Sequence, residues 1–72
     1  MFTKAQQKMI ENGVRNLEIF GYVGKVTKEN ILTNHVFSMY FEKELNKCFG
    51  EGFDEDIRGL LEIINNNRQV AI

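Results

Sequence analysis

The residues from Gly21 to Lys25 have the spacing that comes closest to a site for phosphate recognition. Two glycines are separated by Tyr22 and Val23, and a lysine follows the second glycine. The GxxG loop of KH domains clamps a nucleic-acid backbone with this spacing, and a P-loop cradles phosphate in a related turn. A KH domain needs a three-stranded sheet, and a P-loop needs four residues between its glycines and a preceding strand. Since no segment has a convincing strand pattern, we interpret the glycines as a helix end and the turn after it.

The residues from Asp54 onward imitate the start of a calcium-binding loop. Asp54 and Asp56 have the alternating spacing of an EF-hand. However, Arg58 places a positive charge where an oxygen ligand belongs, and Asn65 stands where a bidentate glutamate is expected. We therefore interpret the acidic residues as the first turn of the last helix, with Asp54 as its N-cap.

Nucleophilic catalysis would need the histidine and the cysteine close together. His35 is the only histidine, Cys48 is the only cysteine, and both fall in one predicted helix. A rise of 1.5 Å per residue separates them by roughly 20 Å, which is too far for a catalytic pair. Two such ligands also cannot complete a four-ligand zinc site. We expect no enzyme activity, no metal and no cofactor, and we interpret Cys48 as a buried core thiol.

Composition and charge narrow the class of protein. The 72 residues are 43% hydrophobic and 26% charged, which is typical of one globular domain. The formal net charge is −1, so the chain has no general attraction for nucleic acid. No apolar run approaches the roughly 18 residues of a membrane span, and the first residues lack the apolar region of a secretory signal. We expect a cytoplasmic protein, and the single cysteine excludes an internal disulfide.

Hydrophobic residues recur at helical spacing in three long segments, which predicts an all-α fold. The first helix should run from about Thr3, its N-cap, to Ile19. The second should run from His35 to Cys48, and the last should begin at Asp54 and end at the asparagines 65–67. The expected architecture is three main helices plus one short helix.

Two capping positions predict the short helix between the first two long ones. Thr27 can cap a helix from Lys28 to Leu32. Thr33 and Asn34 then offer a second cap, so we expect a break there. One continuous helix from Lys28 to Cys48 is the alternative.

Gly13 lies near the centre of the apolar face of the first helix. Glycine costs about 1 kcal/mol in a helix interior. We expect its missing side chain to let another helix approach closely. A hairpin turn at Asn12–Gly13 is the alternative, although the flanking residues alternate poorly.

The core should form where the apolar stripes of the three helices meet. We expect the following residues to build it: Leu17, Phe20, Phe37, Phe41, Leu45, Ile57, Leu61 and Ile64. Tyr22 and Val23 should pack back on this core. The apolar tail formed by residues 70–72 can tuck against it or pair with another chain.

One helical surface offers apolar residues beyond the core stripe. Val36, Met39 and Tyr40 extend the apolar surface of the second long helix, and Lys43 and Lys47 lie nearby. Flexible methionine and amphipathic tyrosine suit contact surfaces. We therefore predict a partner-binding face from these five residues.

Tyr22 is a further candidate binding residue, because it lies beside Lys25 if it stands exposed. If it packs under the short helix instead, it belongs to the scaffold.

A small helix-turn-helix DNA-binding regulator is the alternative function. Three helices with a short one in the middle suit that class. After the break at Asn34, the outward residues include Glu42 among Lys43, Asn46 and Lys47, and this mixture is ambivalent for DNA. We therefore favour a protein partner over nucleic acid.

Residues 11–45 resemble small helical proteins encoded by bacteriophages and prophages. The phrases that carry the resemblance are N-G-x-R-N-L, F-G-Y, V-T-x-E-N-I-L-T and V-F, and they cover about half of the chain. The resemblance implies a non-enzymatic protein that binds and modulates a bacterial host protein in the host cytoplasm. It assigns no site. A homodimer is a further expectation, since the chain is small and its apolar surface generous.

Overall fold

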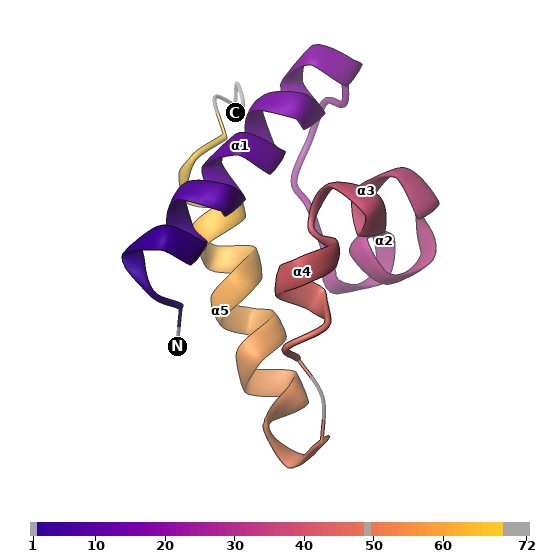
Figure 1. Ribbon diagram of the computed structural model, residues 1–72. Coiled ribbons are helices and arrows are strands. Elements are labelled where there is room, and N and C mark those ends of the chain that lie inside the picture. The colour runs from indigo at the N-terminus through magenta and orange to yellow at the C-terminus, as the bar shows by residue number, and fades with distance from the viewer. Residues whose placement is uncertain (1, 49, 69–72) are drawn as a thin grey trace.

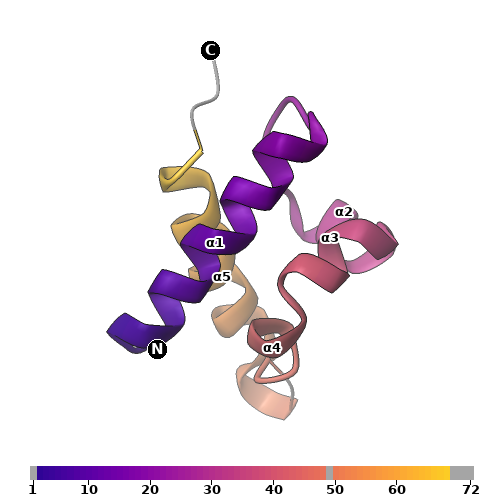
Figure 2. The ribbon, with the colours of Figure 1, turned by 45° about the horizontal axis from the view of Figure 1, so that its top comes forward.

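The computed structural model describes residues 2–48 and 50–68, and all regular secondary structure in this part of the chain is helical, without strands. The all-α fold is therefore confirmed. The helices are α1 (Lys4–Phe20), α2 (Lys28–Thr33), α3 (His35–Tyr40), α4 (Glu42–Leu45), the 3-10 turn η1 (Gly50–Gly52) and α5 (Phe53–Asn66). The two long helices α1 and α5 pack across each other, and α2, α3 and α4 lie to one side of them (Figures 1 and 2). The predicted apolar tail, residues 70–72, lies outside the described residues.

The bounds of α1 are fixed by hydrogen bonds at both ends. Thr3 Oγ1 accepts from the Gln6 backbone N–H at 3.2 Å, and Gln6 Oε1 accepts from the Thr3 N–H at 2.7 Å. This reciprocal capping box satisfies two N–H groups that the helix leaves unpaired. At the other end Gly21 adopts φ 95°, and its N–H donates to the carbonyls of Leu17 and Glu18. Such a left-handed conformation favours glycine. The predicted cap and the predicted role of Gly21 are both confirmed.

The predicted break between α2 and α3 is also present. Thr27 caps α2 through a capping box with Asn30. Asn34 Oδ1 then accepts from the N–H groups of Val36 and Phe37, which starts α3 in a new direction. The alternative of one helix from residue 28 to residue 48 is therefore wrong.

The predicted helix over residues 35–48 is divided at Phe41. Phe41 has φ −119° and ψ 27°, which ends α3 and separates it from the single turn of α4. The break lies where α3 meets α1, because the Phe41 ring and the Tyr40 carbonyl both approach Gly13. We attribute the break to this contact, since packing of a buried aromatic ring readily overrides helix propensity.

The start of α5 also differs from the prediction. The helix begins at Phe53, and Gly52 occupies the N-cap position without a side-chain hydrogen bond, so Asp54 as N-cap is wrong. The Asp54 carboxylate instead accepts a hydrogen bond of 2.8 Å from Lys28 Nζ, which joins α5 to α2. This bond and the lysine charge lower the pKa of Asp54. The other acidic residues remain in the first turn, where the helix dipole favours them.

The core confirms most of the predicted residues. Leu17, Phe37, Phe41, Ile57 and Ile64 are fully buried, and Leu45 and Leu61 are half-buried against them. Cys48 is also buried, as predicted for a core thiol. Buried hydrophobic residues beyond the predicted core are Ile10, Val14, Val26, Ile31 and Leu60.

Phe20 was predicted in the core, and this is wrong, because its side chain is 56% exposed. Phe20 is the last residue of α1, and this end of α1 projects past the neighbouring helices (Figures 1 and 2). The helix period places Phe20 on the apolar face, but within residues 2–48 and 50–68 no element covers its side chain.

The close approach at Gly13 predicts an inverted effect of alanine. Gly→Ala in a helix normally stabilises by about 1 kcal/mol. At Gly13 the new Cβ would lie 2.6 Å from Phe41 Cε1 and 3.0 Å from the Tyr40 carbonyl oxygen. Overpacking of this kind costs about 1–3 kcal/mol, so we expect Gly13→Ala to lower the free energy of unfolding measured by urea denaturation.

Gly59→Ala is the matched control for this prediction. Gly59 lies inside α5, and apart from the α5 backbone and its chain neighbours no described atom lies within 4 Å of the position of its added Cβ. We expect it to raise the free energy of unfolding by up to about 1 kcal/mol. Equal stabilisation by both substitutions would contradict the close approach at Gly13.

The buried thiol of Cys48 yields a second prediction. Burial, and then the negative charge of Asp56, raise the pKa of Cys48. The thiol is 4% exposed and donates to the Glu44 carbonyl. We expect labelling by a thiol reagent at pH 8 to be at least roughly a hundredfold slower in the folded protein than in urea, because it needs an opening of the core. Because the folded state holds this proton more tightly, stability should fall as the pH rises through the raised pKa. Similar labelling rates with and without urea would contradict this burial.

Candidate functional site

Tyr22 anchors the loop between α1 and α2 from the inside. Its hydroxyl donates to the Lys25 carbonyl at 2.9 Å and accepts from Asn30 Nδ2 at 2.9 Å. Its ring meets the Phe37 ring edge to face, with 4.6 Å between the centroids. The side chain is therefore half-buried and directed into the fold, which gives it a scaffold role.

The C-terminal end of α5 holds the same loop from a second direction. The side-chain amide of Asn65 pairs with the backbone of Val26, since Oδ1 accepts from the N–H and Nδ2 donates to the carbonyl, both at 2.9 Å. Arg68 Nη2 donates to the Tyr22 carbonyl at 2.8 Å, and its guanidinium lies 5.1 Å from the Tyr22 ring centroid. The loop is thus fixed by side chains from a distant part of the chain.

Arg68 is an unusual residue in this arrangement, because its side chain is 1% exposed. Its Nε lies 3.8 Å from Glu18 Oε1, which is an ion pair beyond hydrogen-bond length. Within the part of the chain that the structure describes, Nε and Nη1 have no hydrogen-bond partner. The sequence reasoning missed both Asn65 and Arg68 as contacts of the loop, and no local pattern connects them to it.

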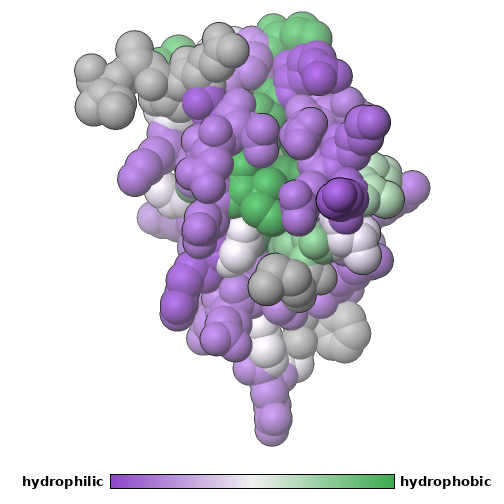
Figure 3. Space-filling model, turned by 90° about the vertical axis from the view of Figure 1, so that its left-hand side faces the viewer, coloured by the Kyte–Doolittle hydropathy of each residue, from purple (hydrophilic) through white to green (hydrophobic). Residues whose placement is uncertain are grey.

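The fixed loop and the end of α1 present three large apolar side chains to solvent. The exposed fractions are 79% for Ile19, 56% for Phe20 and 85% for Val23. We call these three residues the apolar tip. Val23 was predicted to pack on the core with Tyr22; this is wrong for Val23, because the turn directs the two side chains differently. Apolar surface stands at the top of Figure 3, the end of the molecule where Figure 1 places the end of α1.

The predicted binding face is spread over several elements. Met39 is 56% exposed beside a shallow hollow, whereas Val36 and Tyr40 are half-buried and pack against the core. The hollow is lined by His35, Ser38, Met39, Glu42, Leu45 and Asn46. Lys43 and Lys47 are exposed, but Lys47 lies at a different hollow with Phe2, Gln6 and Asp56. The structure therefore separates Lys47 from Met39.

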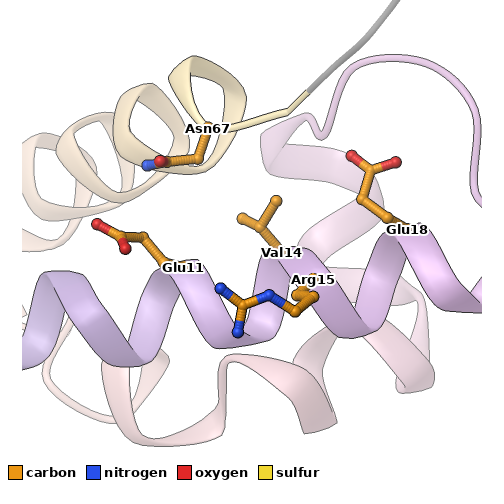
Figure 4. Close-up of a pocket in the computed structure, with 5 residues that line it drawn as sticks. All are labelled: Glu11, Val14, Arg15, Glu18 and Asn67. Atoms are coloured by element: carbon orange, nitrogen blue, oxygen red, sulfur yellow. The ribbon is translucent and has the colours of Figure 1, made fainter.

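A further hollow between α1 and the end of α5 carries mixed charges. Figure 4 shows Val14 at its centre, Asn67 on the α5 side, and Glu11, Arg15 and Glu18 along α1. Arg15 Nη1 donates to Asn12 Oδ1 at 3.0 Å. Among the described residues, the lining of this hollow contains neither histidine nor cysteine.

The nucleotide and metal interpretations find no support in the geometry. Gly21 and Gly24 both have positive φ, 95° and 108°, which is the geometry of a turn. The sheet that a KH domain or a P-loop requires is absent from residues 2–48 and 50–68. In the same ranges no group of three or more histidine, cysteine or acidic side chains is placed to hold a metal ion.

We compared the chain with known proteins at three levels. Neither protein-family models nor curated proteins nor solved structures gave a match. Among the described helices, none combines the length and the apolar character needed to cross a membrane.

Asn65 generates a prediction about the loop. In Asn65→Ala the buried N–H and carbonyl of Val26 lose their partner, which should lower the free energy of unfolding by about 2 kcal/mol. Hydrogen exchange of the Val26 amide should accelerate more than exchange in the middle of α1.

Asn66→Ala is the control, because Asn66 is the next residue of α5 and is exposed. We expect it to change stability by less than about 0.5 kcal/mol. If Asn65→Ala behaves like this control, the amide does not hold the loop.

Proposed function

We propose that this protein is a non-enzymatic protein-binding module whose apolar tip enters an apolar pocket of a partner protein. The observation that supports this proposal is the exposure of Ile19, Phe20 and Val23 at the end of α1 and on the loop after it. Hydrogen bonds and ring contacts of Tyr22, Val26 and Arg68 hold this loop from inside. Three large apolar side chains exposed within five consecutive residues are more than the single scattered apolar residues of an ordinary surface, and such a concentration is typical of contact surfaces.

The rigidity of the loop is the second argument. A loop that is ordered before binding loses little conformational entropy when it docks, so more of the contact energy appears as affinity. Arg68 holds the Tyr22 carbonyl before Val23, and the Tyr22 hydroxyl and the Asn65 amide hold the backbone of Lys25 and Val26 after it. A loop that only connects α1 to α2 does not need hydrogen bonds from α5 and Arg68. Their presence beside exposed apolar side chains therefore favours a binding role for the loop.

The number of apolar side chains in the tip limits how much binding free energy it can contribute. Fully burying a side chain of this kind contributes about 1.5–3 kcal/mol. Three such side chains together reach the lower part of the 4–15 kcal/mol that association costs. The tip therefore acts as an anchor, and flanking polar contacts such as those of the exposed Lys25 must supply the remainder.

The partner we propose is a bacterial host protein, modulated sterically in the cytoplasm by a phage-encoded protein. This part rests on the resemblance of residues 11–45 alone. DNA binding has weaker support, because α3 has six residues and is joined to α2 through Asn34 alone, whereas a recognition helix follows a turn of three or four residues. Absence of a gel shift at low salt is the expected result for DNA.

The test uses the variant Ile19→Ser/Val23→Ser. Both side chains are mostly exposed, so we expect unchanged helical circular dichroism. Affinity capture from a bacterial lysate with the wild-type protein identifies a partner, and the affinity is then measured with that purified partner. We expect the double variant to bind at least about tenfold more weakly, because it loses most of the apolar anchor.

Met39→Ser is the comparison variant, since Met39 is similarly exposed on a different face. We expect it to bind like the wild type. If instead Met39→Ser abolishes binding and the double variant does not, the predicted face at α3 is the binding surface and the tip is not.

A further inference from the structure

A second surface feature, separate from the apolar tip, is a groove between the start of α1 and the side of α5. We call it the α1–α5 groove, and it is lined by Phe2, Glu55, Asp56, Gly59, Glu62 and Ile63. Figure 3 views this side of the molecule and shows apolar surface enclosed by hydrophilic side chains. The groove does not include any residue of the tip, so it is independent of the function proposed above.

The floor of the groove is apolar and open. Phe2 and Ile63 are half-buried hydrophobic residues that pack against the core, so each keeps part of its side chain at the surface. Gly59 lines the same groove about one turn before Ile63 on α5, and apart from the α5 backbone and its chain neighbours no described atom comes within 4 Å of the place where a Cβ would be. A partner can therefore approach the backbone of α5 closely at this point.

The rim of the groove is acidic. Glu55, Asp56 and Glu62 line it, and within the described residues none of the three forms an ion pair, in contrast to Asp54. The first turn of α5 accounts for Glu55 and Asp56 through the helix dipole. Glu62 lies about two turns further on, where the dipole gives no reason for an acidic residue.

We propose that the α1–α5 groove binds a basic amphipathic segment of a partner protein. Apolar side chains of that segment would cover Phe2 and Ile63, while its lysine or arginine side chains extend along the floor and reach the carboxylates. Such side chains combine an apolar stem with a charged end, which matches an apolar floor with an acidic rim. A helix laid into a groove with apolar anchors is a common way for a small domain to bind a peptide.

The probe is a fluorescent helical peptide with leucine at helical spacing and lysine on the flanking positions. A control peptide carries glutamate in place of each lysine. Fluorescence anisotropy should show saturable binding of the lysine peptide, weakened by salt, and no binding of the glutamate peptide. Equal binding of both peptides would overturn the proposed occupant.

Two variants test the groove itself. Gly59→Leu fills the floor and improves helix propensity, so it should fold and bind the lysine peptide at least about tenfold more weakly. Glu55→Gln/Glu62→Gln removes two rim charges and should weaken binding about threefold to tenfold.

Each variant has a matched control. Asn66→Leu adds a leucine at an exposed position of the same helix, and Glu11→Gln/Glu29→Gln makes the same change of net charge elsewhere. Both controls should bind like the wild type. If the controls lose as much affinity as the groove variants, binding is nonspecific and the proposal fails.

Backbone amide shifts on titration locate the peptide. Shifts confined to residues near Phe2, Gly59 and Ile63 support the groove, and shifts centred on Ile19 and Val23 would overturn it. Light scattering measures the molar mass and so tests whether a second copy of the chain occupies the groove. A mass above the 8.4 kDa monomer that Gly59→Leu restores to 8.4 kDa would show that a second copy occupies the groove, contrary to the proposal.

Discussion

The backbone of Val26 is held by the side-chain amide of Asn65 through two hydrogen bonds, and the carbonyl of Tyr22 is held by Arg68. These contacts join the end of α5 to the loop after α1. Inside the loop itself, the Tyr22 hydroxyl donates to the Lys25 carbonyl, and the long-range bonds further reduce the number of conformations that the loop can adopt. The position of Tyr22 under α2 and the outward direction of Val23 both depend on this attachment.

Arg68 makes the attachment energetically unusual. A buried guanidinium is favourable only when its N–H groups have acceptors, and two of the nitrogens of Arg68 have none among the described residues. The Tyr22 carbonyl and the Tyr22 ring provide one hydrogen bond and one cation–π contact, and Glu18 contributes a charge at 3.8 Å. An apolar side chain of similar size could fill the space of Arg68. It would, however, lose the hydrogen bond that Arg68 donates to the Tyr22 carbonyl. This makes orientation of the loop, more than stability, the best physical reason for arginine at this position.

The rest of the fold is stabilised by close packing between helices. A chain of this length buries only about 60% of the surface that it exposes when unfolded, so each contact is a large fraction of the stability. The clearest case is Gly13, where Phe41 lies against the α1 backbone in space that a methyl group would occupy. Gly13 thus leaves room for the Phe41 ring against α1. The same contact lies where α3 ends and α4 begins.

The sequence by itself determined the local interactions at four helix ends, and its patterns predicted them correctly. Thr3, Gly21, Thr27 and Asn34 bond to groups only two to four residues away, so their types and neighbours suffice to predict caps, breaks and an all-α fold. Contacts between distant segments were decided only by the tertiary structure. Val26 meets Asn65 across 39 positions and Tyr22 meets Arg68 across 46, and helical periodicity contains no information about either pair. Periodicity also could not show that Phe20 and Val23 are exposed, because an apolar position becomes core only if another element covers it. The candidate tip therefore arises from the way the helices pack, and the sequence alone gives only the residues from which it is built.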